Sequence, residues 1–331
     1  MTKLISSQFK VCNKTLKELA STVPSIIAHS RANNTVKKYS CYFDKWLRWC
    51  ESFPEITPLP TQEQYMVIYI IFLLQSGKSF PVIEANVSAI KYFHSIVGYN
   101  IGESTIFKHV LEAIKRIIPH TSHKKEALTV EQLHEAVDFL NQEGSLKNMR
   151  TKNIMILSFV AFLRYSECQN LRRSDFKIFD EYAMMFIEKS KTDMYRDGHW
   201  MFISKLNSEL CPIRNLEEYF RFANLDPNST EFIFRAVKSS SSRQSLRKKE
   251  EPISYTTVRE DVLATLKAIG LNSTSFGLHS LRSGGASAAA NFGVSDRLIQ
   301  KHGRWKSIGV KNNYISENLH NLLYVSRNLG L

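Results

Sequence analysis

The sequence has no apolar run that could cross a membrane, which takes about 18 residues. Its longest candidate, Met66 to Leu74, covers only nine residues and is interrupted by Tyr69. The N-terminal residues also lack the long hydrophobic stretch of a signal peptide. We therefore expect a protein that is not secreted and has no transmembrane segment.

Cysteine is scarce too, with five residues in a chain of 331. They are widely spaced, odd in number and include no Cys-x-x-Cys pair: Cys12, Cys41, Cys50, Cys168 and Cys211. This pattern argues against a disulfide framework and a zinc site, and it is typical of a reducing compartment. We expect no bound metal.

What the chain does have is positive charge. Lys and Arg number 44 against 31 Asp and Glu, which gives a formal net charge of +13. A surplus of this size predicts a polyanionic partner, and charge alone allows DNA, RNA or an anionic membrane surface. Hydrophobic residues make up 43% of the chain, and its length is enough for two ordinary domains, each with a core.

The first 118 residues are expected to form a helical bundle without strands. Apolar residues recur at steps of three and four in the stretches that we expect to be helices: 35–49, 61–75, 80–95 and 105–118. The polar and basic stretch 119–127 is expected to be a linker. The helices alone do not decide whether this bundle is only a structural domain or clamps DNA.

The remaining residues, 128–331, are expected to form a second domain of helices around a small β-hairpin. Strands are predicted at 183–188 and 199–203, because the hydrophobic period changes there and an Asp-Gly pair between them signals a turn. The fold class is therefore mainly α with a small β-sheet. The serine-rich, basic stretch 238–251 is expected to be a flexible insertion. Its charge fits a solvated loop, phosphate contacts or a nuclear localisation signal.

A run near the C-terminus holds the parts needed to bind a phosphate and attack it. His279 and Arg282 are three residues apart, which places them on one face of a helix. Histidine can share a proton with an attacking group, and a guanidinium can grip two phosphate oxygens at once. Trp305 offers a single N–H donor, and Tyr314 follows nine residues later. Because a phenol has a pKa near 10, Tyr314 as a nucleophile needs neighbouring cations or a base.

Two further cations complete this set. Arg164 directly follows an apolar helix, and Glu167 stands three positions after it. A lysine of the hairpin turn is expected to protonate the leaving 5′ oxygen, since a departing alkoxide needs a proton at neutral pH. The turn offers Lys189 and Lys191, and we favour Lys191 because it begins the Lys-Thr-Asp turn.

These residues together resemble the active site of the tyrosine recombinases, which include phage integrases, Xer proteins and Cre. The resemblance rests on His279-x-x-Arg282, on Gly303-Arg304-Trp305 with a tyrosine nine residues later, and on Leu-Arg-x-x-Glu ending at Glu167. Lys191 resembles the hairpin lysine of the family, and the N-terminal helices resemble its core-binding domain. The runs His-Ser-Leu-Arg-Ser-Gly-Gly-Ala and His-Gly-Arg-Trp look most like recombinases of eukaryotic mobile elements of the DIRS, Ngaro or Crypton kind.

The resemblance implies a fold and an activity. It implies a C-shaped clamp around double-stranded DNA, made by a helical core-binding domain (1–118) and an α+β catalytic domain (128–331). It implies a site-specific recombinase or integrase that works through a 3′-phosphotyrosyl intermediate, with no cofactor, no metal, no membrane partner and no small-molecule substrate. Catalysis would fall to Arg164, Lys191, His279, Arg282, Trp305 and Tyr314, with Glu167 in support.

The resemblance also implies an assembly and a location. The enzyme would act as a homotetramer, with a dimer on each DNA site and a Holliday junction between the sites. The tail 316–331 would dock on a neighbouring protomer or pack on its own domain. We expect the nucleus if the source is a eukaryotic mobile element, and the cytoplasm otherwise.

Two other functions fit part of the pattern. A type IB topoisomerase or a telomere resolvase would use the same chemistry without strand exchange, and the topology of the DNA products would separate them from a recombinase. A mobile-element protein that has lost its activity would survive as a DNA-binding protein. That last reading predicts the loss of at least one catalytic residue, and the sequence lacks none of them.

Overall fold

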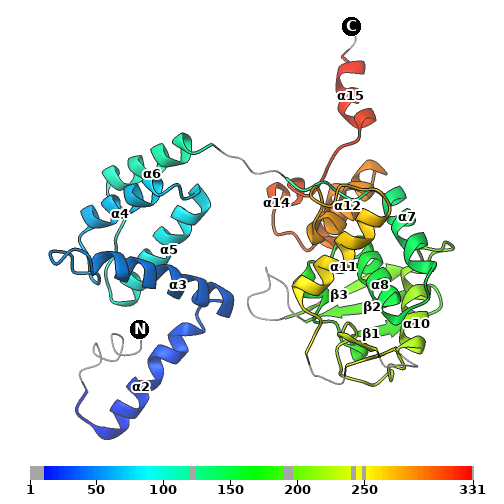
Figure 1. Cartoon of the computed structure of the whole chain (residues 1–331), viewed down its shortest axis with the longest axis horizontal. Coiled ribbons are helices and arrows are strands. Elements are labelled where there is room, and N and C mark those ends of the chain that lie inside the picture. Colours follow the sequence, from blue (N-terminus) through cyan, green and yellow to red (C-terminus); the bar gives the residue numbers. More distant parts are fainter. Residues whose placement is uncertain (1–10, 120–123, 189–196, 240–243, 248–250, 330–331) are drawn as a thin grey trace. The chain divides into compact units, whose positions relative to one another are not determined.

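The computed structural model describes residues 11–119, 124–188, 197–239, 244–247 and 251–329 (Figure 1). The chain divides into two compact units, 1–122 and 123–331, and the division falls within the expected linker. None of the helices in the described ranges is long and apolar enough to cross a membrane.

The first unit is a bundle of helices. Its elements are α2 (Lys14–Ala28), α3 (Asn33–Cys50), α4 (Glu63–Gln75), α5 (Phe80–Ile96) and α6 (Thr105–Ile117). The last four agree with the predicted helices to within a few residues, whereas α2 was not predicted as a separate helix. Aliphatic and aromatic residues together fill the core. Trp46 is fully buried there and donates its N–H to the carbonyl of Pro58 at 3.0 Å. The carboxylate of Glu63 accepts the backbone N–H of Gly102 at 2.7 Å, which ties the start of α4 to the loop before α6.

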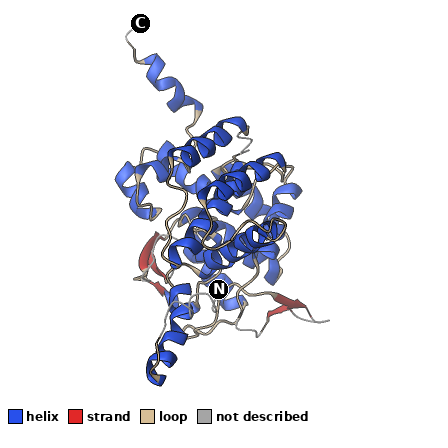
Figure 2. Cartoon of the chain, turned by 90° about the vertical axis from the view of Figure 1, so that its left-hand side faces the viewer, coloured by secondary structure: helices blue, strands red, loops and turns tan. Residues whose placement is uncertain are grey.

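The second unit combines helices with two small sheets (Figure 2). Its helices are α7 (Val130–Asn141), α8 (Leu146–Val160), α9 (Tyr165–Cys168), α10 (Pro212–Phe222), α11 (Tyr255–Ala268), α12 (Leu278–Asn291), α13 (Asp296–His302), α14 (Ile308–Asn312) and α15 (Leu319–Arg327), with a 3₁₀ turn at Arg173–Asp175. Its strands are β1 (Phe176–Ile178), β2 (Tyr182–Ile187), β3 (His199–Ser204), β4 (Val237–Ser239) and β5 (Gln244–Leu246). The predicted class, mainly α with a small β-sheet, is confirmed.

The larger sheet is antiparallel in the order β1-β2-β3. Alternate residues of β2 are buried, as expected for a strand with one face on a core. Met185 lies opposite Met201 of β3, and both side chains are buried there. The structure adds β1 to the two predicted strands.

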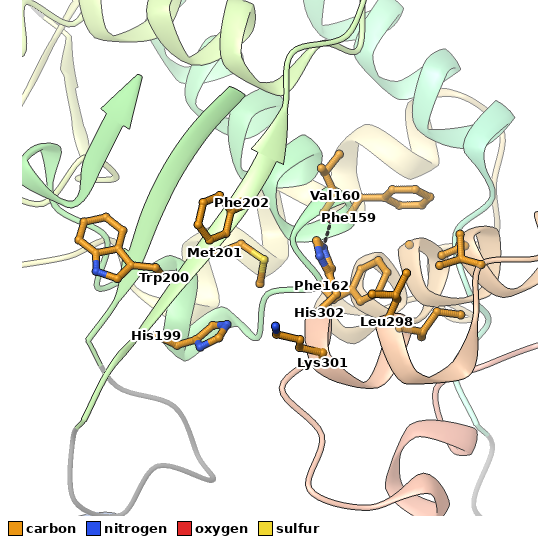
Figure 3. Close-up of a pocket in the computed structure, with 14 residues that line it drawn as sticks. Phe159, Val160, Phe162, His199, Trp200, Met201, Phe202, Leu298, Lys301 and His302 are labelled. Atoms are coloured by element: carbon orange, nitrogen blue, oxygen red, sulfur yellow. Dashed lines mark hydrogen bonds between the residues drawn. The ribbon is translucent and has the colours of Figure 1, made fainter. Parts of the chain in front are cut away.

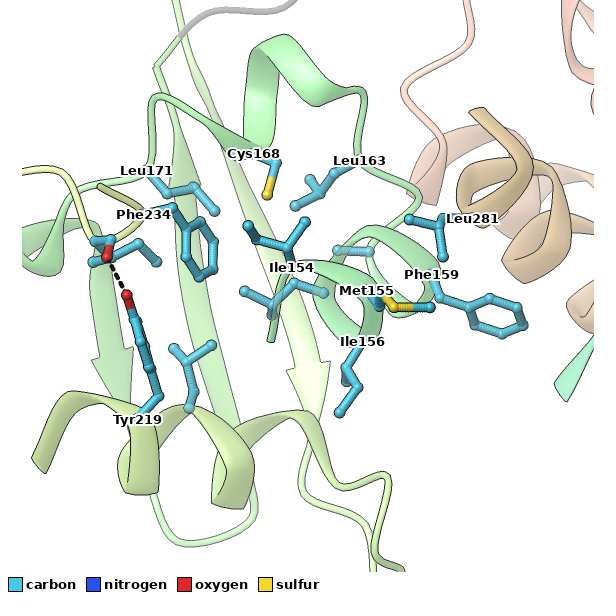
Figure 4. Close-up of a cluster of buried hydrophobic side chains, with 14 of the residues drawn as sticks. Ile154, Met155, Ile156, Phe159, Leu163, Cys168, Leu171, Tyr219, Phe234 and Leu281 are labelled. Atoms are coloured by element: carbon cyan, nitrogen blue, oxygen red, sulfur yellow. Dashed lines mark hydrogen bonds between the residues drawn. The ribbon is translucent and has the colours of Figure 1, made fainter. Parts of the chain in front are cut away.

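Helix α8 is the centre of the second unit. Almost all of its residues are buried, because α7, α10 and α12 pack around it. Figure 4 shows the apolar cluster that its side chains form with Cys168, Leu171 and Phe234. The hydroxyl of Tyr219 donates to the carbonyl of Ile233 at 2.7 Å, so this buried polar group is satisfied.

The stretch that was expected to be a flexible insertion differs from the prediction in its described residues. Strands β4 and β5 pair there as a short antiparallel ladder, with Val237 opposite Leu246. The buried guanidinium of Arg235 donates a hydrogen bond to the carbonyl of Arg247 at 3.2 Å. This bond connects the ladder to the rest of the domain. Three-residue strands are too short to produce a period-2 signal in the sequence. The prediction therefore followed the serine-rich composition and missed these strands.

The contact between α8 and α12 requires a residue without a side chain. A Cβ atom on Gly285 would overlap the backbone carbonyl oxygen of Phe159. We expect Gly285→Ala to lower the free energy of unfolding by about 3 kcal/mol, because the two backbones must move apart. Urea denaturation measures this. Gly309→Ala is the matched control, since a Cβ there meets no atom within 4 Å, and equal stability of both variants would contradict the expectation.

Candidate active site

The carboxylate of Glu167 lies at the centre of the candidate site. Its Oε1 accepts a hydrogen bond from Arg164 at 2.7 Å, and its Oε2 accepts one from Arg304 at 2.9 Å. Nη1 of Arg282 lies 3.7 Å from Oε2. All four side chains are almost completely buried. One carboxylate is therefore surrounded by three guanidinium groups, which leaves two positive charges in excess.

The pKa of Glu167 reflects this arrangement. Burial acts to raise the pKa of the carboxyl group, but the charge of Arg304, the backbone N–H of Arg164 and the charges of Arg164 and Arg282 outweigh it. The net effect holds the pKa of Glu167 below its usual range. The group is therefore ionised at neutral pH and holds the guanidinium groups around it.

A strained turn presents Arg164 to the site. Helix α8 ends at Val160, and Phe162 adopts a φ of +47°. A residue other than glycine in this left-handed region costs about 1 kcal/mol. The carbonyl oxygen of Phe162 accepts hydrogen bonds from Arg304, at 3.0 Å, and from Arg282. These bonds stabilise the turn, and α9 begins directly after Arg164.

Arg282 projects from α12 into the same cluster and is fully buried. Its Nη2 donates to the carbonyl of Gly303 at 2.7 Å. Its guanidinium carbon lies 4.7 Å from the ring centre of Trp305 and 5.0 Å from that of Tyr314. Burial, followed by the charge of Arg164, lowers the pKa of Arg282 to about 9, so the group stays charged at neutral pH.

The rings of Trp305 and Tyr314 pack against each other beside this guanidinium. Their ring centroids are 5.2 Å apart, and both pack in a small apolar cluster with Phe162. Trp305 is 4% exposed, and its indole N–H is buried without a hydrogen-bond partner among the residues that the structure describes. Tyr314 is half-buried and follows α14.

A clamp from α12 holds the chain on the C-terminal side of Tyr314. The hydroxyl of Ser287 donates to the carbonyl of Tyr314 at 3.3 Å and accepts the backbone N–H of Ser316 at 2.8 Å. The side chain of Asn291 bonds the carbonyl of Ser316 and the N–H of Asn318, both at 3.1 Å. The position of Tyr314 is therefore fixed on the same protomer as Arg282.

The structure thus brings together five of the residues singled out from the sequence: Arg164, Glu167, Arg282, Trp305 and Tyr314. His279 lies in the first turn of α12, about one turn before Arg282, and its side chain is exposed. Lys191 and its alternative Lys189 lie outside the described residues.

Comparisons with known proteins identify the family of the chain. The sequence profile of the phage integrase family matches residues 126–320, which is more than half of the chain. The chain belongs to the phage integrase family. It is a tyrosine recombinase, an enzyme that cleaves and rejoins DNA strands by transesterification through a 3′-phosphotyrosyl intermediate, which confirms the function predicted from the sequence.

Individual relatives of this tyrosine recombinase cover most of its length. An "Integrase/recombinase xerD homolog" from Selenomonas ruminantium is 26% identical over 293 residues, 87% of this chain and 83% of the relative. The fold is similar to that of the XerH site-specific recombinase bound to a palindromic difH substrate, with a TM-score of 0.64 and 14% identity over 99% of this chain and 88% of that one. It is also similar to a lambda integrase dimer bound to a COC′ core site, with a TM-score of 0.58 and 18% identity over 91% and 95% of the two chains.

Arg304 is the residue of this cluster that the sequence reasoning did not single out. Its side chain is 6% exposed, and its backbone φ is +54°. It stands within the Gly303-Arg304-Trp305 run, but no local pattern predicts its ion pair, because its partner Glu167 lies 137 positions earlier in the chain.

An apolar pocket of about 660 Å³ lies next to the candidate active site (Figure 3). Its walls come from the end of α8, from β3 and from α13, and include Phe159, Phe162, Trp200, Phe202 and Leu298. His199, Lys301 and His302 line it as well. Nε2 of His302 donates to the carbonyl of Val160 at 2.8 Å.

Two histidines of this pocket predict a pH dependence of stability. Burial lowers the pKa of both His302 and His199, and the positive charge of Arg304 acts in the same direction. The hydrogen bond from His302 to Val160 opposes the shift but does not reverse it. The unfolded chain therefore binds more protons than the folded one just below the usual histidine pKa of about 6.5. We expect the melting temperature to fall as the pH drops from 6.5 towards 5, and to fall less in a His302→Gln variant.

Thermal melts between pH 7.5 and 5 measure this effect. His320→Gln is the control, because His320 is exposed on α15. A pH profile of His302→Gln that matches the parent would contradict the assignment.

Proposed function

We propose that this recombinase cuts DNA with Tyr314 and holds the scissile diester with Arg164 and Arg282. The observation that carries the proposal is the position of the Tyr314 ring, 5.0 Å from the guanidinium carbon of Arg282 in the same protomer. This places a positive charge beside the attacking side chain, where it can neutralise the charge that develops on the diester. The ring of Trp305 also packs against the ring of Tyr314, with 5.2 Å between their centroids.

The charge of the cluster supports the binding of a phosphodiester. Three buried guanidinium groups face one carboxylate, and an anion would balance part of the excess. Arg164 and Arg282 would hold the non-bridging oxygens, which carry the charge of the transition state. The indole N–H of Trp305 lacks an acceptor among the described residues and would donate to the same oxygens.

The chemical step exchanges one phosphoester for another. Oη of Tyr314 attacks the phosphorus, a bond forms between them, and the bond from phosphorus to the 5′ oxygen breaks. His279 takes the proton of the phenol, and Lys191 gives a proton to the leaving 5′ oxygen. The product is a 3′-phosphotyrosyl linkage, which the 5′-hydroxyl of a second strand attacks in reverse. The number of phosphoester bonds is unchanged, so the step needs no cofactor and no external energy source.

The partner in this proposal is double-stranded DNA, with residues 1–118 as the clamping domain and 128–331 as the catalytic domain. The net charge of +13 supports it. Three structurally similar proteins have been seen with DNA: the XerH recombinase, lambda integrase and the integrase of the Tn1549 transposon, to which this chain is similar with a TM-score of 0.54.

The assembly in this proposal is a dimer on each site and a tetramer during strand exchange. Support comes from α15, where the apolar side chains of Leu319, Leu322 and Tyr324 are 59–70% exposed. These side chains would bind in the apolar pocket next to the candidate active site of a neighbouring protomer. Leu322→Asp should then leave dimers on single DNA sites but remove the larger complex in a native gel. Ser326→Asp, which adds the same charge elsewhere on α15, should retain it.

We also propose that the protein originates from a mobile element. Two runs in its C-terminal part, His-Ser-Leu-Arg-Ser-Gly-Gly-Ala and His-Gly-Arg-Trp, favour a eukaryotic element of the DIRS, Ngaro or Crypton kind. Such a protein acts in the nucleus, and the basic run from Arg243 to Lys249 would serve as its localisation signal. A fluorescent fusion of the chain in a eukaryotic cell tests this. Nuclear accumulation that disappears when the run is neutralised supports the proposal, and an even distribution in the parent contradicts it.

Covalent trapping tests the central proposal. Nicked or phosphorothiolate-bearing duplexes from the ends of the source element would be incubated with the protein, and the attached peptide would be identified by mass spectrometry. The expected peptide contains phosphorylated Tyr314. Recombined strands as products support a recombinase, whereas relaxed circles indicate a topoisomerase and hairpin ends a telomere resolvase. A duplex that is bound but never attached indicates a DNA-binding protein without catalysis.

A further inference from the structure

The guanidinium of Arg304 makes several hydrogen bonds within the candidate site. Its Nη1 donates to the carbonyls of His302, at 2.9 Å, and Ala161, at 3.2 Å. Its Nη2 donates to the carbonyls of Ala161 and Phe162 and to Glu167, at 3.3, 3.0 and 2.9 Å. The side chain thus joins the end of α8, the start of α9 and the end of α13.

The backbone of Arg304 is strained so that this side chain can reach its partners. With a φ of +54°, it adopts the left-handed conformation that glycine tolerates and other residues disfavour. The hydrogen bonds of the guanidinium compensate for this strain. The strained conformation therefore depends on the contacts that the side chain makes.

Those contacts hold a second strained turn, the one that presents Arg164. Phe162 also has a positive φ, of +47°, and its carbonyl accepts hydrogen bonds from Arg304 and Arg282. Arg164 follows two residues later and enters the site from this turn. Arg304 therefore fixes the path of the chain at the point where it delivers Arg164.

Arg304 also determines how the charge of Glu167 is shared. It occupies Oε2 at 2.9 Å, and Arg164 occupies Oε1 at 2.7 Å. Arg282 lies 3.7 Å from Oε2, which is too far for a hydrogen bond. The carboxylate is thus largely engaged by the other two arginines, and the charge of Arg282 remains for an incoming anion.

We infer that Arg304 is a positioning residue of the recombinase, which holds Arg164 and Arg282 in place for the diester without touching the diester itself. The inference rests on the proposed function. Only 6% of the Arg304 side chain is exposed, and its hydrogen bonds go to protein acceptors. A lysine cannot replace it, because an ammonium group is a point charge and cannot span acceptors on three elements.

The test compares Arg304→Lys, which keeps the charge, with Arg304→Gly, which removes the side chain and relaxes the backbone. Single-turnover formation of the covalent adduct on a trapping duplex would be measured together with the Kd for DNA. We expect the rate to fall about 100-fold in both variants, as for a misplaced catalytic group, while the Kd changes less than about threefold. Arg221→Lys on the exposed end of α10 is the matched control and should keep the parent rate.

A second substrate separates positioning from general damage. In a methylphosphonate duplex, a methyl group replaces one non-bridging oxygen and the diester carries no charge. If Arg304 acts by placing charged groups around the diester, the ratio of the parent rate to the Arg304→Lys rate should be at least about tenfold smaller on this duplex. A merely structural lesion would slow both substrates by the same factor.

The remaining outcomes are distinct. An Arg304→Lys rate within threefold of the parent, an equal loss on both substrates, or unfolding of both variants in circular dichroism would each overturn the inference. If the parent itself forms no adduct at Tyr314 on bound DNA, the proposed function fails, whatever the variants do.

Discussion

Replacing Tyr314 with phenylalanine is expected to abolish the covalent protein–DNA adduct and leave DNA binding unchanged. The substitution removes one hydroxyl and keeps the ring that packs against Arg282 and Trp305. Loss of an essential nucleophile costs an enzyme on the order of 10⁶ in rate, so no adduct should be visible. A denaturing gel with a nicked duplex measures attachment, and a gel shift measures binding.

The control is Tyr324→Phe. Tyr324 lies ten residues later in the sequence, on α15, with 59% of its surface exposed, and it is a tyrosine of the tail that could attack in trans. We expect this variant to form the adduct at the parent rate. An adduct that survives in Tyr314→Phe would remove Tyr314 from the active site and turn attention to Tyr324.

Glu167→Gln is expected to produce the largest loss of stability. The variant keeps the shape of the side chain but leaves three buried guanidinium groups without their common anion. Removing one partner of a buried ion pair costs about 3–5 kcal/mol, because the charge left behind is neither paired nor hydrated. Urea denaturation of the parent and the variant at pH 7 measures the difference.

The pH dependence of this difference follows from the lowered pKa of Glu167. A carboxyl group whose pKa is lower in the folded state contributes its stability above the unfolded pKa, near 4.3, and loses it as the pH falls through the folded value. The gap between parent and Glu167→Gln should therefore be constant near neutral pH and close at acidic pH. Glu217→Gln, on the exposed face of α10, is the control and should match the parent throughout.

Phosphate adds an independent check on the same variant. Without the carboxylate, the cluster carries three positive charges, so an anion that binds the folded state should stabilise the variant more than the parent. A larger rise of the melting temperature with added sodium phosphate is expected for Glu167→Gln. Equal rises in both proteins would mean that the cluster does not attract anions.

The parts of the candidate site that could be read from the sequence are those set by short spacings. His279 and Arg282 are three positions apart, and helix geometry places such residues on one face. The same spacing joins Arg164 to Glu167, and the structure shows them paired at 2.7 Å. The catalytic roles of these residues, and of Lys191, stay predictions.

The rest depended on contacts between distant parts of the chain. The role of Arg304 comes from a left-handed backbone conformation and a partner 137 positions away, and neither leaves a local pattern. The strands β1, β4 and β5 have three residues each, too few for an alternation to be recognised. The ladder of β4 and β5 was therefore not predicted, because composition was the only signal there.

The clamp of Ser287 and Asn291 has a consequence for how far the C-terminal helix can reach. Four residues, 315–318, connect Tyr314 to the start of α15. Even fully extended, five Cα-to-Cα steps span at most about 18 Å. Any surface that holds the first residue of α15 must lie within that radius of the Tyr314 backbone, whichever protomer supplies it. A second subunit that binds this helix must therefore also lie close to Tyr314, the proposed nucleophile.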